Sequence, residues 1–380
     1  MMYAPLANNP LAAIDAVVKG EADGLSVATS GSTGTPRDVL ISARAIRASA
    51  LATVERLGGP GSWLLALPLE RIGGALVAVR AEMTGQALTT MPHGTFTATG
   101  FARVAASVPP GRRYVSLVPT QVVRLMASDL GRDALALFDA VLVGGAAFGD
   151  GERPNNVIET YGMTETTGGC VYDGDPLRGV EVAIADDDRI LICGATLADG
   201  FDDGDNSAWV THGGVRWLRT GDLGRWHGGK LEVLGRADDI IISGAHKVHP
   251  LNVERAIAAL GGVDPVVVVG VDDAEWGKRV VAVYEAPLDS VYPGGLYPGG
   301  LYPDHAGAGA DAVSPIPDAR GRQDGHVAAE LRAALREALP NYALPRDVVT
   351  TRSLPRTAGG KIDRRAAAAL AAQALTRKSS

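Results

Sequence analysis

Residues 28–37 of the chain read ATSGSTGTPR, a stretch that predicts both the fold and the kind of ligand. A run of Gly, Ser, Thr and Pro favours neither a packed helix nor a strand, so we expect a loop after a short strand over 25–28. The two glycines let successive N–H groups converge, as in loops that bind polyphosphate. The candidate ligands are Thr29, Ser30, Gly31, Ser32, Thr33 and Gly34. The spacing matches neither the Walker loop nor the dinucleotide fingerprint. A plain flexible loop is the alternative.

Composition limits the class of protein. The chain has 380 residues, which suggests two or three domains, and its 46% hydrophobic content is ample for buried cores. A net charge of −7 gives no electrostatic footprint for nucleic acid. Cys170 and Cys193 offer neither a disulfide framework nor a metal-binding spacing. We find no membrane-spanning run and no signal peptide, so we expect a cytoplasmic protein without membrane insertion.

The predicted elements alternate between strand and helix over the first 160 residues. Apolar runs predict strands at 25–28, 62–68, 114–118, 140–143 and 157–160. Helices are expected over 43–57, 74–84 and 120–127, with Ser42 and Thr120 as N-caps. This order indicates an α/β fold with a mostly parallel, helix-covered sheet. From about residue 179, short strands at 180–185, 189–193, 215–219 and 231–234 predict an antiparallel β subdomain.

A domain boundary is expected near Gly235. Residues 1–234 would form a large N-terminal domain and residues 235–380 a small, mobile α+β domain. In the small domain we expect helices from 251 and over 327–339, and strands over 265–271 and 279–286. A PGGLY repeat opens a Pro/Gly/Ala/Asp-rich segment at about 290–322, which favours a disordered surface insertion. A Tyr/Pro tract that binds a partner is the alternative.

Four further motifs carry candidate functional residues. Tyr161–Thr166 (YGMTET) follows a predicted strand, where α/β proteins bind ligands, and its Glu165 suits Mg²⁺. Asp222 ends the motif RTGD and could accept from both ribose hydroxyls. The third motif runs from GRADD (235–239) to SGAHK (243–247), and the fourth is RTAGGKI (356–362). Taken singly, these motifs are also typical of a capped helix, a tight turn or a solvated lysine.

Together and in this order, the five motifs resemble the adenylate-forming superfamily of acyl- and aryl-CoA synthetases, luciferases and peptide-synthetase adenylation domains. The resemblance runs from about Ser26 to Arg364, apart from the insertion, and includes DDAEWGKRVVAV at 272–283. It implies a ligase that uses ATP, Mg²⁺ and CoA. A carboxylate attacks the α-phosphate of ATP to give an acyl-adenylate and pyrophosphate, and a thiol then displaces AMP.

The resemblance also implies roles for individual residues. Lys361 would offset the charge repulsion between the carboxylate and the α-phosphate. Thr164 and a Mg²⁺ ion on Glu165 would act with it. Asp238 would be the hinge about which the small domain swings between the half-reactions. The implied ATP-binding residues beyond the loop are Arg37, Tyr161, Gly162, Asp222 and Arg236, and the implied CoA-binding residues are Ser243 and Gly244.

The choice of acid rests on a finer resemblance. The short N-terminus and the run YGMTETTGGCVYDGDPLRGV at 161–180 resemble the actinobacterial o-succinylbenzoate–CoA ligases of menaquinone biosynthesis. The second carboxylate of that substrate would need donors, and the candidates are Arg71, Gly144, Gly145 and Thr167. Another aryl- or fatty acyl-CoA ligase, an adenylation domain serving a carrier protein, and a non-catalytic adenylate-binding module are the alternatives.

Two positions depart from the superfamily pattern. Arg37 stands where the phosphate loop usually ends in Lys, and Arg71 stands where His or an aromatic residue is usual. Arg37 keeps a cation with a different reach and hydration. Arg71 is either a solvated side chain or one that suits the pocket to a dicarboxylate. The short N-terminus leaves out part of the usual wall, which a second subunit of a homodimer could supply.

Overall fold

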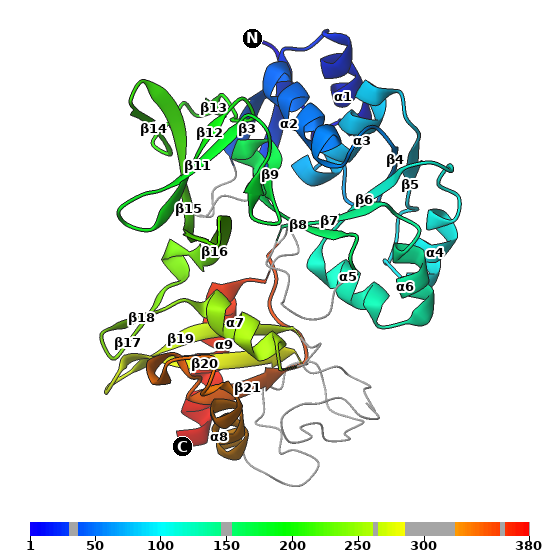
Figure 1. Cartoon of the computed structure of the whole chain (residues 1–380). Helices are drawn as coiled ribbons and strands as arrows, with labels where there is room; N and C mark the ends of the chain where they lie inside the picture. Colours follow the sequence, from blue (N-terminus) through cyan, green and yellow to red (C-terminus); the bar gives the residue numbers. More distant parts are fainter. Residues whose placement is uncertain (30–36, 146–153, 261–264, 286–323, 358–361, 380) are drawn as a thin grey trace. The chain divides into compact units, whose positions relative to one another are not determined.

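The computed structural model describes residues 1–29, 37–145, 154–260, 265–285, 324–357 and 362–379 (Figure 1). The described residues up to Val233 form one compact unit, and those from Leu234 onward form a second. The sequence places the boundary one residue later.

A seven-stranded sheet organises the first unit, in the order β10-β9-β8-β7-β6-β4-β5. The five strands from β8 to β5 in that order are parallel, whereas β9 and β10 run antiparallel to their neighbours. Its strands are β4 (Ser62–Leu65), β5 (Leu88–Thr90), β6 (Arg113–Leu117), β7 (Ala140–Val143), β8 (Val157–Met163), β9 (Gly168–Tyr172) and β10 (Asp175–Pro176). The predicted parallel sheet is thus confirmed, with an antiparallel edge.

Helices bury both faces of this sheet, because alternate residues of each strand point to opposite sides. Trp63 and Leu65 of β4 pack in the core beneath α2 (Ala43–Arg56) and α3 (Ile72–Thr84). Leu64 between them packs in the opposite core, formed with α4 (Ala98–Ala105), α5 (Pro119–Met126) and α6 (Asp129–Leu135). Figure 1 shows α2 and α3 on one side of β4 to β7 and α4 to α6 on the other.

The helix starts follow from local capping. Ser42 caps α2 as predicted, since its hydroxyl accepts from the Ala45 N–H at 3.4 Å. Thr120 is not the N-cap of α5, which begins at Pro119 after Val118. The fixed φ of Pro and its missing N–H suit the first helical position. The side chain of Gln121 accepts from the Val118 N–H at 2.9 Å, which completes the cap.

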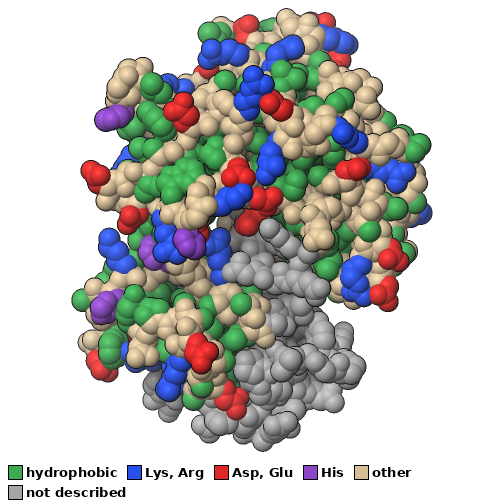
Figure 2. Space-filling view, viewed as in Figure 1, with side chains coloured by type: hydrophobic (Ala, Val, Ile, Leu, Met, Phe, Trp, Pro, Cys, Tyr) green, Lys and Arg blue, Asp and Glu red, His purple; other side chains and the backbone are tan. Residues whose placement is uncertain are grey.

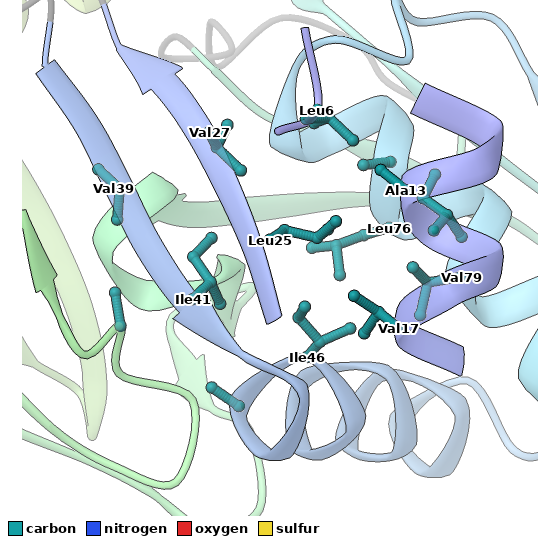
Figure 3. Close-up of a cluster of buried hydrophobic side chains, with 14 of the residues drawn as sticks. Leu6, Ala13, Val17, Leu25, Val27, Val39, Ile41, Ile46, Leu76 and Val79 are labelled. Carbon is teal, nitrogen blue, oxygen red and sulfur yellow. The ribbon is translucent and has the colours of Figure 1, made fainter. Parts of the chain in front are cut away.

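A second sheet carries the predicted phosphate loop. Its order is β1-β2-β3-β13, and its elements, with the helix that packs on it, are β1 (Tyr3–Pro5), β2 (Gly24–Thr29), β3 (Arg37–Ser42), β13 (Gly200–Phe201) and α1 (Pro10–Lys19). The loop therefore connects two antiparallel strands and does not lead into a helix. Figure 3 shows Leu25 and Ile41 of this sheet in one buried cluster with Leu76 of α3.

The antiparallel β subdomain is also confirmed. Its strands are β11 (Val180–Ile184), β12 (Arg189–Gly194), β14 (Trp209–His212), β15 (Val215–His227) and β16 (Lys230–Arg236). They are ordered β11-β12-β15-β14, with β16 also on β15.

The second unit is a five-stranded sheet with helices on both faces. Its elements are β17 (Ile241–Ser243), β18 (His246–Val248), β19 (Val266–Asp273), β20 (Gly277–Glu285), β21 (Asp347–Thr351), α7 (Pro250–Ala258), α8 (Asp324–Leu335) and α9 (Arg364–Ser379). Val268 packs in the core with α7 and α8, while its neighbour Val267 packs in the core with α9. The expected insertion at 290–322 lies outside the described residues. Among the described helices, none is both long and apolar enough to cross a membrane.

Candidate active site

The carboxyl edge of the parallel sheet brings several predicted residues together. β7 ends at Val143 and leads into Gly144 and Gly145, whereas β8 continues past that point to Met163. Gly144 is close to β8, since a Cβ there would lie 2.5 Å from the Thr160 hydroxyl oxygen. The parallel direction of β4 places the segment after it, with Arg71 as the N-cap of α3, at the same edge.

The YGMTET motif forms the end of β8 and one turn of 3₁₀ helix over Thr164–Thr166. The Thr166 hydroxyl accepts from the Met163 N–H at 2.9 Å and fixes the start of this turn. The main-chain carbonyl of Glu165 accepts from the Ala198 N–H at 2.9 Å. The backbone is therefore held on both sides, while the side chains of Thr164 and Glu165 are half-buried.

Tyr161 and Asp222 lie in contact, although 61 residues separate them in the chain. The Tyr161 hydroxyl donates to the Asp222 carboxylate at 2.9 Å. The backbone of Asp222 is held in a turn, because the Asp222 N–H donates to the Thr220 hydroxyl at 3.1 Å. Burial, followed by the charge of Asp222, raises the pKa of Tyr161 well above its ordinary value, so the hydroxyl stays a donor. Two residues predicted to bind ATP are thus in direct contact.

The base of the phosphate loop is closed by its own ends. Thr29 and Arg37 are cross-strand partners, and the Thr29 hydroxyl donates to the Arg37 carbonyl at 3.0 Å. The Arg37 guanidinium donates to Asp205 at 2.9 Å and lies 3.9 Å from the centroid of the Phe201 ring. Ser30, Gly31, Ser32, Thr33 and Gly34 lie outside the described residues.

Thr167 is fully buried, and its side chain is engaged in the fold. Its hydroxyl donates to the Thr196 carbonyl at 2.6 Å, and its own carbonyl accepts from the Ser49 hydroxyl at 2.8 Å. With φ of 52° at Thr167 and 78° at Gly168, the chain reverses from the 3₁₀ turn into β9. A role of Thr167 in substrate binding stays a prediction.

In the second unit, the segment at the expected hinge contains two neighbouring aspartates that form separate ion pairs. Arg236 forms an ion pair with Asp238 at 3.3 Å, with both side chains well exposed. The neighbouring Asp239 pairs instead with Arg364 at 3.1 Å. Lys361 lies outside the described residues. Just beyond it, Ile362 forms an isolated β-bridge with Arg356.

The predicted CoA-binding residues adjoin a basic cleft. Ser243 is buried, and the Gly244 N–H donates to the Trp276 carbonyl at 2.9 Å. A Cβ at Gly244 would lie 2.7 Å from the Trp276 ring, so this approach requires glycine. Trp276 borders a cleft of about 530 Å³, and the Arg346 guanidinium lies 3.7 Å from the centroid of its ring. The cleft also contains Arg279, which is paired with Asp273 and Asp347, together with Arg332, Arg336 and Glu275.

Sequence reasoning missed the partners that hold these groups. Arg37 contacts Asp205 and Phe201. No pattern in the sequence around these two residues predicts a contact with residue 37. The alternation of Val39 and Ile41 could have revealed β3, since both are fully buried. Trp276 stands in a segment that was singled out for resemblance alone, and Arg346 carried no signal.

Comparisons with known proteins agree with this geometry. The family model for the AMP-binding enzyme matches residues 27–197. The probable 2-succinylbenzoate–CoA ligase of Mycobacterium tuberculosis is 37% identical over 355 residues, which cover 90% of this chain and 83% of the relative. The 2-succinylbenzoate–CoA ligase of Escherichia coli K12 is 33% identical over 69% of this chain and 58% of its own.

Solved structures show the same fold. An o-succinylbenzoate CoA synthetase (MenE) from Bacillus subtilis, in complex with the acyl-adenylate intermediate OSB-AMP, has a TM-score of 0.67 at 23% identity, covering 90% of this chain and 68% of that one. ATP-bound MatB from Rhodopseudomonas palustris has a TM-score of 0.70 at 22% identity, covering 92% and 68%. The chain therefore belongs to the AMP-binding enzymes, as an AMP-forming acid–thiol ligase related to the 2-succinylbenzoate–CoA ligases.

Proposed function

We propose that the chain is an o-succinylbenzoate–CoA ligase. It joins o-succinylbenzoate to ATP, releases pyrophosphate and transfers the acyl group from AMP to coenzyme A, as a step of menaquinone biosynthesis. The contact between Tyr161 and Asp222 at the sheet edge supports the adenosine part of this proposal. The 37% identity to a relative named for this reaction supports the choice of acid.

The first half-reaction brings a carboxylate against a polyanion. Two unit charges about 4 Å apart repel by roughly 1 kcal/mol in water and about 4 kcal/mol at an intermediate dielectric. Cations are therefore required, and we assign Lys361 to the meeting of the carboxylate and the α-phosphate, with Arg236 near the ribose and phosphates. Thr164 stands beside Glu165 and donates to phosphate.

The described residues suit a Mg²⁺ that is held mainly by the nucleotide. Within them, no three His, Cys, Asp or Glu side chains converge on a metal-sized site. Mg²⁺ at nucleotide sites often takes only one or two protein carboxylates and completes its shell with phosphate oxygens and water. The half-buried Glu165 supplies one such carboxylate. When bound, the ion neutralises charge on the phosphates.

We assign the second carboxylate of o-succinylbenzoate to Arg71 and to the backbone at Gly145, since the Gly144 N–H already donates to the Leu117 carbonyl at 3.3 Å. Arg71 is exposed at the N-cap of α3, and its side chain makes no capping hydrogen bond. The unpaired N–H groups of a helix start and a nearby guanidinium both favour an anion. Arg71→Gln should raise KM for o-succinylbenzoate and leave KM for benzoate unchanged, if benzoate is turned over at all.

Coenzyme A carries phosphates and an adenine ring, and the basic cleft beside Gly244 offers matching groups. Arginines pair with phosphates and Trp276 presents an aromatic face, although Arg346 already covers one side of it. We therefore place the nucleotide part of coenzyme A at this cleft. Trp276→Ala should raise KM for coenzyme A and leave ATP–pyrophosphate exchange unchanged.

The decisive experiment is ATP–pyrophosphate exchange across a panel of carboxylic acids, followed by addition of coenzyme A. Exchange with o-succinylbenzoate and release of its CoA thioester support the proposal. Exchange with only benzoate or long-chain acids would assign another acyl-CoA ligase, and exchange without CoA transfer would favour a carrier-protein acceptor. No exchange with any acid would leave a binding module.

Lys361→Ala separates the two half-reactions. We expect it to lower the rate of exchange by a factor on the order of 10²–10³. Thiolysis of a supplied acyl-adenylate should be largely spared. Equal loss of both half-reactions would refute the assignment of Lys361.

Basic and acidic side chains are interspersed on the visible face of the described residues (Figure 2). The absence of a nucleic-acid partner, the cytoplasmic location and the homodimer stay predictions.

A further inference from the structure

We propose that Arg364 is a positioning residue that joins the hinge segment to the segment bearing Lys361, so that the two move as one body. The inference rests on the proposed roles of Asp238 as hinge and Lys361 as the cation of adenylation. It concerns the second unit alone, in which all of the contacts that support it lie.

Arg364 uses every nitrogen of its guanidinium. Its Nε pairs with the Asp239 carboxylate at 3.1 Å, and its Nη2 pairs with Glu254 at 3.2 Å. Its Nη1 donates to the Val268 carbonyl at 2.8 Å and to the other oxygen of Glu254. A two-pronged contact of this kind fixes orientation as well as distance. Burial lowers the pKa of Arg364, but the charges of Glu254 and Asp239 raise it overall, so the side chain stays a cation.

The partners of Arg364 belong to the rigid part of the unit. Glu254 stands on α7 with its side chain only 14% exposed, and it also accepts from the Val268 N–H at 2.7 Å. Val268 lies in the middle of β19, fully buried. The guanidinium is thereby fixed to a helix and to a central strand at once. Asp239 is held to that framework through the same cation.

The segment that contains Lys361 is closed at its base, directly before Arg364. Arg356 and Ile362 form a β-bridge, and the Asp363 N–H donates to the Pro355 carbonyl at 2.8 Å. The Asp363 carboxylate accepts from the Ala366 N–H at 3.0 Å and so caps α9. The position of the base is therefore set by residues that adjoin Arg364 in the chain.

The consequence concerns where the hinge can bend. On its upstream side the Arg236–Asp238 pair is exposed, and such pairs contribute little. On its downstream side Asp239 is tied to the half-buried Arg364. Rotation is thus confined to the backbone up to Asp238, and Asp239 turns together with the described base of the Lys361 segment, Arg356, Ile362 and Asp363.

The test is Asp239→Asn, which weakens the hinge contact and leaves both contacts of Arg364 with Glu254. We expect kcat of adenylation, per titrated active site, to fall about tenfold, the scale of one charge-assisted hydrogen bond, and thiolysis of a supplied acyl-adenylate to be largely spared. KM for ATP and for the acid should stay unchanged, because their proposed ligands are mostly in the first unit. A merely structural role would lower the melting temperature and leave kcat per active site intact.

Matched variants complete the design. Asp272→Asn removes an exposed ion pair of 2.8 Å with Lys278 in the same unit, and should leave kcat unchanged. Arg364→Lys should retain more activity than Arg364→Met, since it keeps the cation. Wild-type kcat in Asp239→Asn, or a change confined to KM, would overturn the inference. Lys361→Ala is measured in parallel: if it retains adenylation, the proposed function of Lys361 fails and the inference with it. If it abolishes adenylation while Asp239→Asn is normal, only the inference fails.

Discussion

Tyr161→Phe tests whether the Tyr161–Asp222 contact shapes the ATP site. The substitution keeps the ring and removes the hydroxyl that donates to Asp222 at 2.9 Å. A hydrogen bond to a charged group contributes about 1.5–3 kcal/mol, and we take the lower end because both side chains are only half-buried by surface exposure. About 1.4 kcal/mol corresponds to a factor of ten, so we expect KM for ATP to rise about tenfold.

The assay is ATP–pyrophosphate exchange with ATP varied at saturating acid. Because the pKa of Tyr161 is raised well above its ordinary value, the hydroxyl remains protonated, and the ratio of mutant to wild-type KM should be constant from about pH 6 to 9. An unchanged KM would refute the reasoning. A lower KM would also refute it, since the hydroxyl would then compete with ribose for Asp222.

Tyr172→Phe is the matched control. It also removes one buried tyrosine hydroxyl, which bonds to the Thr53 hydroxyl at 3.0 Å beneath the sheet. Because Thr53 is fully buried, the loss of its partner should destabilise the fold by about 1–2 kcal/mol. The expected result is a lower melting temperature with an unchanged KM for ATP, which separates a local effect on the site from a general loss of stability.

Three further predictions concern other parts of the chain. Burial raises the pKa of the Cys170 thiol to about 12, so iodoacetamide at pH 8 should label it in urea and not in the native state, as read by mass spectrometry. Its neutral form favours folding fully below the ordinary thiol pKa, and this contribution declines as pH rises from there to about 12. Gly162→Ala should lower the melting temperature and abolish exchange, because the new Cβ would lie 2.1 Å from the Gly168 carbonyl oxygen; normal stability would contradict this. Arg37→Met removes the contacts with Asp205 and Phe201 and should raise KM for ATP severalfold, whereas an equal fall in kcat with constant KM would point to a different role.

The local sequence pattern was sufficient to predict where helices and strands lie. It was insufficient to predict which strands pair with one another. The apolar run at 140–143 predicted β7 with its bounds, because a strand buried on both faces needs no polar alternation. The predicted helix over 43–57 matches α2 to one residue, since Ser42 supplies a local start signal. By contrast, β13 pairs Phe201 with Val39, 162 residues away, and no local property of either residue specifies that pairing.

The same limit applies to the candidate site. Tyr161 and Asp222 were both predicted for the nucleotide from their motifs, yet their hydrogen bond depends on how β8 and β15 are brought together. Arg37 was predicted among the ATP-binding residues, and no local pattern indicates that its guanidinium contacts Asp205 and Phe201. The sequence gives the type of each side chain, but the residue that it contacts depends on tertiary packing.

The stretch at 168–173, on which the choice of acid rests, illustrates how motif and fold overlap. Cys170 and Tyr172 of β9 are fully buried, so these two side chains contribute to the core. Gly168 is the link to the site: a Cβ there would lie 2.5 Å from Leu76 of α3, the helix that begins after Arg71. A larger residue at 168 would press on the buried Leu76 side chain and would be strained at a φ of 78°. The stretch therefore contacts α3 through Gly168, and a glycine is required there by packing and by backbone conformation.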